Sequence, residues 1–279
     1  MEIRARAKIN LTLDVIGRRP DGYHDLASVM QEIDLADTLV MEPAEEISLV
    51  VDPPVVTAGA DNLILRAARL LREYGRVREG AAIRLTKRIP VGAGLGGGSA
   101  DAAAALQGLN ELWGLGLEPG MLKELGAGLG SDIPFCLTGG TALVTGRGEV
   151  VEPLTPLPVM DLVLVRPPFK VSTAAIYRLW DERGLAGGAA TAAMLEAVTR
   201  GDWRRVASCL ANDLEAVTCN LHPEVFAIKR GLAGALAVLM SGSGPTVFSL
   251  WPEVQPAVLS RLFPSYQVMF TRTAVEEPG

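Results

Sequence analysis

The stretch Ile89-Pro-Val-Gly-Ala-Gly-Leu-Gly-Gly-Gly-Ser-Ala-Asp101 carries five glycines in seven residues and follows a strand-like run over residues 82–88. An alanine-rich amphipathic helix is expected to start near Ser99. Glycine loses more backbone entropy on folding than any other residue, so packing does not explain the run. The glycines allow positive φ angles and bring bare backbone N–H groups close to a ligand. Just before a helix N-terminus, with its partial positive charge, these donors favour phosphate, and we predict a phosphate-binding loop.

Two common phosphate motifs fit this loop only in part. The Walker A pattern matches at Gly92, Gly97 and Ser99, but Gly98 stands where its lysine belongs. The Rossmann pattern needs an acidic residue about twenty positions further on, at the end of a second strand. Residues 113–120 instead have the sequence of a helix end and a turn. A flexible linker is the remaining alternative, and the flanking apolar strand and helix disfavour it. We interpret the stretch as a phosphate loop of another kind.

Length and charge limit the classes of partner. With 279 residues the chain is long enough for two domains. Its formal net charge of −6 and pI of about 5.1 argue against nucleic acid or an anionic membrane surface as a partner. The sequence has no run of 18 apolar residues to span a membrane. We expect a small-molecule substrate, no nucleic-acid or membrane partner, and a monomer or weak homodimer.

Cysteine and histidine usage bears on compartment and metals. Cys136, Cys209 and Cys219 are odd in number and widely spaced, so they predict neither a disulfide framework nor a zinc site. The N-terminal segment lacks the apolar core of a signal peptide, and a cytoplasmic, reducing environment is expected. His24 and His222 are the only histidines, which excludes a multi-histidine metal site. No metal-ligating residue is assigned.

Residues 2–16 alternate apolar and polar side chains, as in a half-buried strand. Lys8, Asn10, Thr12 and Asp14 then share the polar face. For Lys8, an ordinary solvent-exposed strand lysine is the alternative to a functional one.

The turn Pro20-Asp-Gly22 delivers Tyr23 and His24 to the start of a strand expected over residues 26–35. A tyrosine and a histidine side by side can stack on a flat base and hydrogen-bond to it. An aromatic hairpin corner is the alternative.

A helix is predicted over residues 61–74, with Asp61 or Asn62 as N-cap. Its core face is expected to carry Leu63, Ala67, Leu70, Leu71 and Tyr74. Further along the chain, Asp132 lies in a loop of small residues directly before the apolar run at 133–137. A carboxylate that enters a core-like segment is costly unless it is paired or functional, so Asp132 is a candidate site residue. A capping or turn aspartate is the alternative.

Prolines at positions 153, 156 and 158 mark the predicted domain boundary, which gives an N-terminal domain of residues 1–153 and a C-terminal domain of residues 154–279. Few strands and several helices beyond the boundary predict an antiparallel sheet with helices on one face. The second glycine turn, Ser241-Gly-Ser-Gly244, suits close approach to a ligand or a plain β-turn. His222, before Pro223, is interpreted as a helix-capping position.

In combination these motifs resemble the GHMP kinase superfamily. The matching motifs are Ala7-Lys-Ile-Asn-Leu11, Arg19-Pro-Asp-Gly-Tyr-His24, Asn62-Leu-Ile-Leu-Arg-Ala-Ala68, Gly94-Leu-Gly-Gly-Gly-Ser99, Gly130-Ser-Asp-Ile-Pro-Phe135 and Ser241-Gly-Ser-Gly244. They span nearly the whole chain in the family's order. The resemblance implies an α+β, two-domain GHMP kinase fold with a ribosomal protein S5 domain 2-like N-terminal domain and a ferredoxin-like C-terminal domain. It also implies a left-handed βαβ crossover, against the usual rule.

The resemblance further implies a kinase that moves the γ-phosphoryl of ATP, as Mg-ATP, to a hydroxyl. Within the superfamily the motifs are most similar to the branch that acts on the 2-hydroxyl of 4-(cytidine 5'-diphospho)-2-C-methyl-D-erythritol, in the non-mevalonate isoprenoid precursor pathway. One alternative is another GHMP small-molecule kinase of the homoserine or mevalonate type, which Tyr23-His24 and the triple glycine disfavour. The other is a non-catalytic nucleotide-binding or RNA-binding protein, which the acidic pI and the pair Lys8 and Asp132 disfavour.

The site roles follow from the same resemblance. Asp132 would accept the hydroxyl proton, and Lys8 beside it would keep that carboxylate ionised and neutralise the developing phosphoryl charge. The expected substrate contacts are Asn10 to the diol, Tyr23 and Tyr177 to the two faces of cytosine, His24 to its polar edge, Thr173 to the diphosphate or sugar, and Gly242. The expected ATP contacts are Asn62, Pro90, Val91, Gly92, Ala93, Gly94, Leu95, Gly96, Gly97, Gly98, Ser99 and Ala100.

Two departures from the family pattern concern the loop. Ser99-Ala100 stands where relatives commonly have Ser-Ser, so a second hydroxyl is absent. Gly97 and Gly98 stand where other GHMP kinases have hydroxyl residues. A magnesium-binding serine is therefore not expected from the loop, although Mg-ATP remains the expected substrate.

Overall fold

A computed structural model describes residues 1–274 and divides into two compact units, which are described separately. The first unit comprises residues 1–7, 35–91 and 96–138, and the second comprises residues 8–34, 92–95 and the residues from Gly139 on. The strands β1 (Glu2–Asn10) and β3 (His24–Ala44) contribute residues to both units. The α+β class predicted from the sequence is confirmed. The domain boundary after residue 153 stays a prediction.

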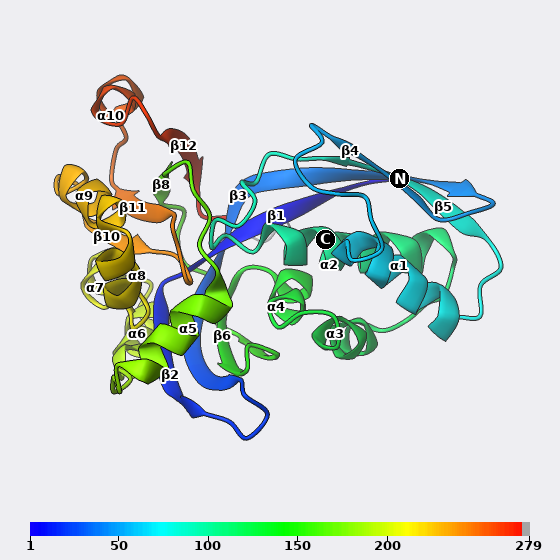
Figure 1. The fold of residues 1–279 in the computed structure, drawn as a ribbon, viewed down its shortest axis with the longest axis horizontal. Coiled ribbons are helices and arrows are strands. Elements are labelled where there is room, and N and C mark those ends of the chain that lie inside the picture. The colour runs from blue at the N-terminus through cyan, green and yellow to red at the C-terminus, as the bar shows by residue number, and fades with distance from the viewer. Residues whose placement is uncertain (275–279) are drawn as a thin grey trace. The chain divides into compact units, whose positions relative to one another are not determined.

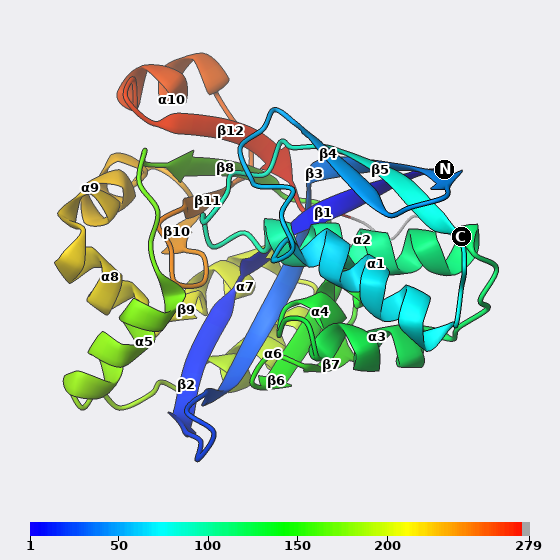
Figure 2. The same ribbon diagram turned by 45° about the vertical axis from the view of Figure 1, so that its right-hand side comes forward.

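The first unit packs helices against a small sheet. Its strands β4 (Ser48–Asp52) and β5 (Gly80–Thr86) are parallel neighbours, and β5 pairs antiparallel with β3 over residues 38–44. Its helices are α1 (Leu63–Tyr74), α2 (Gly97–Leu112), α3 (Pro119–Ala127) and α4 (Ile133–Thr138). Figures 1 and 2 show α1 and α2 side by side on the same side of β4 and β5. The alanines of α2 let the helix lie close to its neighbours, so the first turn of α2 has a rigid support.

The second unit contains two sets of strands. In one, β3 pairs with β2 (Thr12–Arg18) and β6 (Thr141–Gly146), with β7 (Val150–Pro153) and the short β9 (Ala211–Asn212) beside them. The other is an antiparallel sheet in the order β10 (Ala237–Met240), β11 (Val247–Trp251), β8 (Asp161–Arg166), β12 (Gln267–Arg272). This sheet confirms the antiparallel arrangement predicted for the later part of the chain.

Six helices complete the described part of the second unit: α5 (Thr173–Glu182), α6 (Ala190–Thr199), α7 (Trp203–Ser208), α8 (Glu215–Leu221), α9 (Pro223–Gly231) and α10 (Pro256–Leu262). Side chains of α9 and α10 share one apolar cluster with Val163 and Val165 of β8. No helix within residues 1–274 is long and apolar enough to cross a membrane.

Several strand predictions are corrected. The single strand expected over residues 2–16 is two strands that break at Leu11. Residues 2–7 are half-buried as predicted, but the rest of the segment is not, because Lys8, Asn10, Thr12 and Asp14 are buried along with the apolar residues between them. The reason is tertiary: Asp14 accepts hydrogen bonds from the backbone at the start of α6, which covers that face of β2. The strand expected over 26–35 extends over all of β3.

The helix predictions were partly right. Asn62 is the N-cap of α1, but Tyr74 is 47 % exposed, so its assignment to the core was wrong. Helix α2 begins at Gly97, earlier than Ser99. Helices α4 and α8 were missed because six and seven residues are too few to give a clear helical period.

Candidate functional site

The glycine loop ends on the uncapped N-terminus of α2. Gly92, Gly94 and Gly96 have φ angles of 65°, 77° and 71°, a region in which side chains larger than hydrogen are strained. Gly96 occupies the N-cap position, and no side chain caps the helix there. The first N–H groups of an α-helix have no partner within the helix. The start of α2 thus combines backbone donors that no side chain caps with the positive end of a helix, the features that an anion site requires.

The second glycine turn, residues 241–244, packs against this loop. A Cβ on Gly94 would lie 2.3 Å from the carbonyl oxygen of Ser241, so the two backbones touch. Ser241 Oγ donates a hydrogen bond to the Gly94 carbonyl at 2.9 Å. Asn212 fixes this glycine turn, because its Nδ2 donates hydrogen bonds to the carbonyls of Met240 and Gly242. The second glycine turn therefore makes a close backbone contact, but the segment that it contacts is the glycine loop. A contact between Gly242 and a ligand stays a prediction.

Lys8 and Asn10 lie beside the same loop within the second unit. The backbone N–H of Lys8 donates to the Leu95 carbonyl at 3.0 Å. Its buried ammonium donates to Asn10 Oδ1 at 2.8 Å, and Asn10 Nδ2 donates to Ser28 Oγ at 2.9 Å. A Cβ on Gly242 would lie 3.5 Å from Asn10 Oδ1. A lysine only 4 % exposed is costly to keep, so the solvent-exposed alternative for Lys8 was wrong.

Asp132 lies in the first unit, directly before α4. Its backbone carbonyl accepts a hydrogen bond from the Cys136 N–H at 3.1 Å, which starts the helix. The loop that contains it lies beside the first turn of α2, since a Cβ on Gly130 would be 3.9 Å from Ser99 Oγ. Ile133 packs into the core between the helices. The structure therefore brings the loop that contains Asp132 close in space to the first turn of α2, although Ser99 and Asp132 are 33 positions apart in the sequence.

Both polar atoms of the Asn62 side-chain amide form hydrogen bonds within the protein. Its Oδ1 accepts from the Ile64 N–H at 2.9 Å and its Nδ2 donates to the Thr57 carbonyl at 2.9 Å. The next residue, Leu63, lies 3.7 Å from the position of a Cβ on Gly98. Asn62 thus lies near the start of α2, and its role toward a nucleotide stays a prediction.

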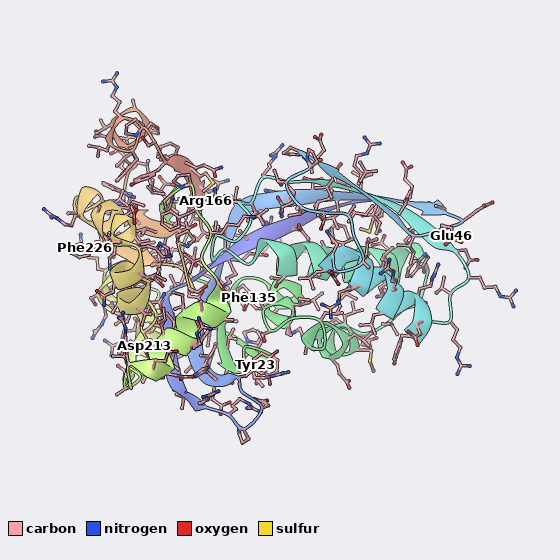
Figure 3. All side chains as sticks on the ribbon, viewed as in Figure 1. Tyr23, Glu46, Phe135, Arg166, Asp213 and Phe226 are labelled. Carbon is pink, nitrogen blue, oxygen red and sulfur yellow. The ribbon has the colours of Figure 1, made fainter. Side chains whose placement is uncertain are left out.

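The predicted base-binding residues form two groups in the second unit. Tyr23, in the loop between β2 and β3, is 56 % exposed (Figure 3), and the guanidinium of Arg147 lies 5.1 Å from its ring centroid. His24 is buried and stacks on Tyr177 with ring centroids 4.8 Å apart. His24 Nε2 lies 2.7 Å from Asp181 Oδ1. Sequence reasoning missed Arg147 and Asp181, because both contacts join segments far apart in the chain.

Thr173 is the first residue of α5, and its hydroxyl lies 2.8 Å from that of Ser243 in the second glycine turn. This contact connects the start of α5 to the turn that supports the loop. His222 is at the N-cap position of α9 as predicted, but its side chain forms no cap and its ring stacks on Phe169.

The departures from the family pattern have a physical reason at one position. A Cβ on Gly97 would lie 2.8 Å from Ile89 Cγ2 and 3.4 Å from Lys87 Nζ, so no hydroxyl residue fits there without movement. Gly98 differs, because its nearest neighbour would be Leu63 at 3.7 Å.

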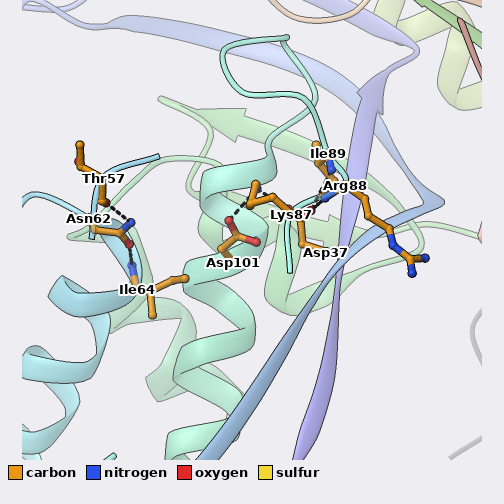
Figure 4. A network of polar contacts seen from close by, with 8 residues as sticks. All are labelled: Asp37, Thr57, Asn62, Ile64, Lys87, Arg88, Ile89 and Asp101. Atoms are coloured by element: carbon orange, nitrogen blue, oxygen red, sulfur yellow. Dashed lines mark hydrogen bonds and ion pairs between the residues drawn. The ribbon is translucent and has the colours of Figure 1, made fainter. Parts of the chain in front are cut away.

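A buried ionic triad was missed altogether. Lys87, just before the loop, donates to Asp101 Oδ2 at 2.8 Å and to Asp37 Oδ2 (Figure 4). Burial raises the pKa of Asp101 from its ordinary value of 3.8 to about 7, opposed by the charge of Lys87 and reinforced by that of Asp37. Burial alone would lower the pKa of Lys87, but the two carboxylates outweigh it and raise the value. One signal was present in the sequence: Lys87 is among only five lysines and ends a strand-like run.

Comparison with known proteins covers nearly the whole chain. The family described as GHMP kinases N terminal domain matches residues 62–140, and GHMP kinases C terminal matches residues 194–265. The 4-diphosphocytidyl-2-C-methyl-D-erythritol kinase of Pelotomaculum thermopropionicum is 56 % identical over 91 % of this chain and 90 % of its own length. A crystal structure of 4-(cytidine 5'-diphospho)-2C-methyl-D-erythritol kinase is 36 % identical, with a TM-score of 0.83 over 99 % of this chain and 100 % of that one. A homoserine kinase from Cytophaga hutchinsonii is 19 % identical with a TM-score of 0.72, over 97 % of this chain and 95 % of its own, and is similar in fold alone.

Proposed function

The chain belongs to the GHMP kinases and, within them, to the 4-diphosphocytidyl-2-C-methyl-D-erythritol kinase family, and on this premise we propose that it phosphorylates the 2-hydroxyl of 4-(cytidine 5'-diphospho)-2-C-methyl-D-erythritol. The reaction would take the γ-phosphoryl of ATP and serve the non-mevalonate route to isoprenoid precursors in the cytoplasm. The observation that carries the substrate is the 56 % identity to a relative of that name over 91 % of the chain.

Phosphoryl transfer requires mainly positioning and stabilisation of charge, so few protein groups need to react. We assign Asp132 as the acceptor of the proton that leaves the 2-hydroxyl. We assign Lys8 to the neutralisation of charge on the transferred phosphoryl group, where an ammonium held in a buried position is most effective. Support for these roles comes from the burial of Lys8 against Asn10 and from the position of the Asp132 loop beside the first turn of α2.

The glycine loop would bind the phosphates of ATP through backbone N–H groups. Magnesium would arrive on those phosphates, as is usual for kinases, and would add positive charge against the transferred group. Ser99 is the one hydroxyl residue in the loop, and we assign no side chain to the metal.

His24 is suited to distinguish cytosine from uracil. A carboxylate only accepts hydrogen bonds, so contact with Asp181 fixes the proton of a neutral imidazole on Nε2. The other nitrogen, Nδ1, is then an acceptor, which matches the exocyclic amino group of cytosine and opposes the carbonyl of uracil at the same position. The ring of Tyr23, over which the guanidinium of Arg147 lies, would stack on the base.

Replacement of His24 by Ala is expected to raise the KM for the cytidylyl substrate about tenfold, because the base loses an oriented hydrogen bond in a buried position. The KM for ATP should stay within about twofold, since His24 belongs to the predicted base site and not to the glycine loop. Steady-state kinetics with each substrate varied in turn would measure both constants. The wild-type preference for a cytidine over a uridine diphosphate derivative should also decrease in this variant.

His222→Ala is the matched control, because it removes the only other histidine and also breaks a ring stack. It should leave the KM for the cytidylyl substrate unchanged. An unaltered KM in His24→Ala would refute the assignment of His24 to the base.

The substrate itself is tested by a phosphorylation assay with four acceptors: the cytidine diphosphate derivative, the unlinked methylerythritol polyol, homoserine and mevalonate. Turnover of the first alone is expected. Turnover of homoserine or mevalonate at a comparable rate would overturn the proposed substrate and retain only the kinase class.

A further inference from the structure

The triad Lys87, Asp37 and Asp101 connects both ends of the glycine loop. Lys87 and its neighbour Arg88 precede the loop, and Asp101 follows it in the second turn of α2. Asp37, in β3, accepts from the backbone N–H groups of Arg88 and Ile89 through Oδ1 and from the Lys87 ammonium through Oδ2. Lys87 in turn donates to Asp101. One connected set of buried hydrogen bonds thus fixes the strand that leads into the loop and the helix that leaves it.

All three side chains are nearly inaccessible: Asp37 is 0 %, Asp101 4 % and Lys87 8 % exposed. Buried ion pairs are weak contributors to stability, since apolar residues of similar volume often stabilise a protein equally well. What such a set offers is fixed geometry, because each charge must stay near its partners. Because the three side chains are this inaccessible, solvent does not substitute for a lost partner.

We propose that Lys87, Asp37 and Asp101 are positioning residues that hold the glycine loop in the conformation that binds the phosphates of ATP. The inference rests on the proposed function in one respect, which is that the loop is the ATP site. Lys87 also acts at short range, because its ammonium lies 3.4 Å from the position of a Cβ on Gly97, the first residue of α2. The net charge of the triad therefore lies next to the first turn of α2, where we propose that phosphate binds.

That charge depends on pH. With both carboxylates ionised, one ammonium and two carboxylates sum to −1, and protonation of Asp101 makes the sum zero. Burial raises the pKa of Asp101 to about 7, and Lys87 and Asp37 are the charged groups that act on it. Its second oxygen, Oδ1, has no hydrogen-bond partner within residues 1–274, which adds to the cost of the ionised form. Negative charge next to the loop repels phosphate. The affinity for ATP should therefore fall as the pH rises through about 7.

The test measures binding of a non-hydrolysable ATP analogue by calorimetry, with no acceptor substrate present. Lys87→Met should raise the Kd about 10- to 100-fold, because Asp37 and Asp101 lose the cation that they share and the loop loses its anchor. Arg88→Met is the matched control: it removes one positive charge at the next residue, whose side chain is exposed and points away from the triad (Figure 4). The control should change the Kd by no more than about twofold.

A pH series separates positioning from a merely structural role. The wild-type Kd should rise about three- to tenfold between pH 6 and pH 8 beyond the change seen in Asp101→Asn, which has the same shape but no titrating group. Because ATP titrates equally in both measurements, its own protonation cancels. Asp101→Asn also remains informative if Lys87→Met fails to fold.

Parallel pH profiles for wild type and Asp101→Asn, or wild-type affinity in folded Lys87→Met, would overturn the proposal. These outcomes are distinct from failure of the proposed function, which would appear as a wild-type protein that does not bind the ATP analogue or does not phosphorylate the cytidylyl substrate.

Discussion

Asp132→Asn is expected to lower kcat by roughly 10²–10⁴-fold, the usual contribution of a positioned proton acceptor. The amide has nearly the shape of the carboxylate but cannot take the proton of the 2-hydroxyl. Single-turnover kinetics with saturating ATP and cytidylyl substrate would measure the chemical step directly. Binding of ATP should change little, because the glycine loop and α2 are untouched.

The control for this variant is its thermal unfolding, which should remain a single cooperative transition, since the Asp132 carbonyl still accepts from Cys136 at the start of α4. Full turnover by Asp132→Asn would show that this residue orients the hydroxyl at most and that another group accepts the proton. A large rise in the KM for ATP without a change in kcat would also contradict the assignment.

Gly94→Ala is expected to reduce both stability and activity strongly. Gly94 has a φ of 77°, which costs a residue with a Cβ about 1–3 kcal/mol of folding free energy. The new methyl group would also lie 2.3 Å from the Ser241 carbonyl oxygen, so one of the two backbones must move. A displacement of about 1 Å in a phosphate site can cost roughly a hundredfold in rate, and we expect a loss of that order in kcat/KM for ATP.

Gly98→Ala is the matched control in the same loop. Gly98 has no positive φ and open space for a methyl group, with Leu63 at 3.7 Å as the nearest atom. Chemical denaturation of the two variants should therefore differ widely, with the stability of Gly98→Ala close to that of the wild type. Equal loss of stability in both would mean that the backbone approach to Ser241 is not what requires glycine at position 94.

Local sequence was sufficient for the features with a local cause. The glycine run, the N-cap at Asn62 and the turn before Tyr23 depend on the conformational preferences of a few consecutive residues. The antiparallel arrangement of the later strands followed from the few strands and several helices expected there, and the α+β fold followed from the family resemblance. The family resemblance rested on six short motifs, and the 56 % identity to a named relative agrees with it.

Burial of polar residues could not be predicted in the same way. The alternation over residues 2–16 indicates that one face is polar, but it cannot indicate that Asp14 meets the start of α6 or that Lys8 is covered. The errors over residues 2–16 share one cause, which is that the partners come from distant parts of the chain. Helix α4 was missed for a different reason, because its six residues are too few for a readable period.

The sequence by itself therefore predicted a phosphate loop that lacks a Walker lysine, and it determined to which superfamily the chain is similar. Only the tertiary structure decided why the loop has its shape: Ser241 meets Gly94 across 147 residues, and Asp37 meets Lys87 across 50. The first contact is partly buried and the second is buried, and a polar group withdrawn from water must find its partner wherever the fold supplies one. Nothing in the residues next to Gly94 or Lys87 specifies that partner.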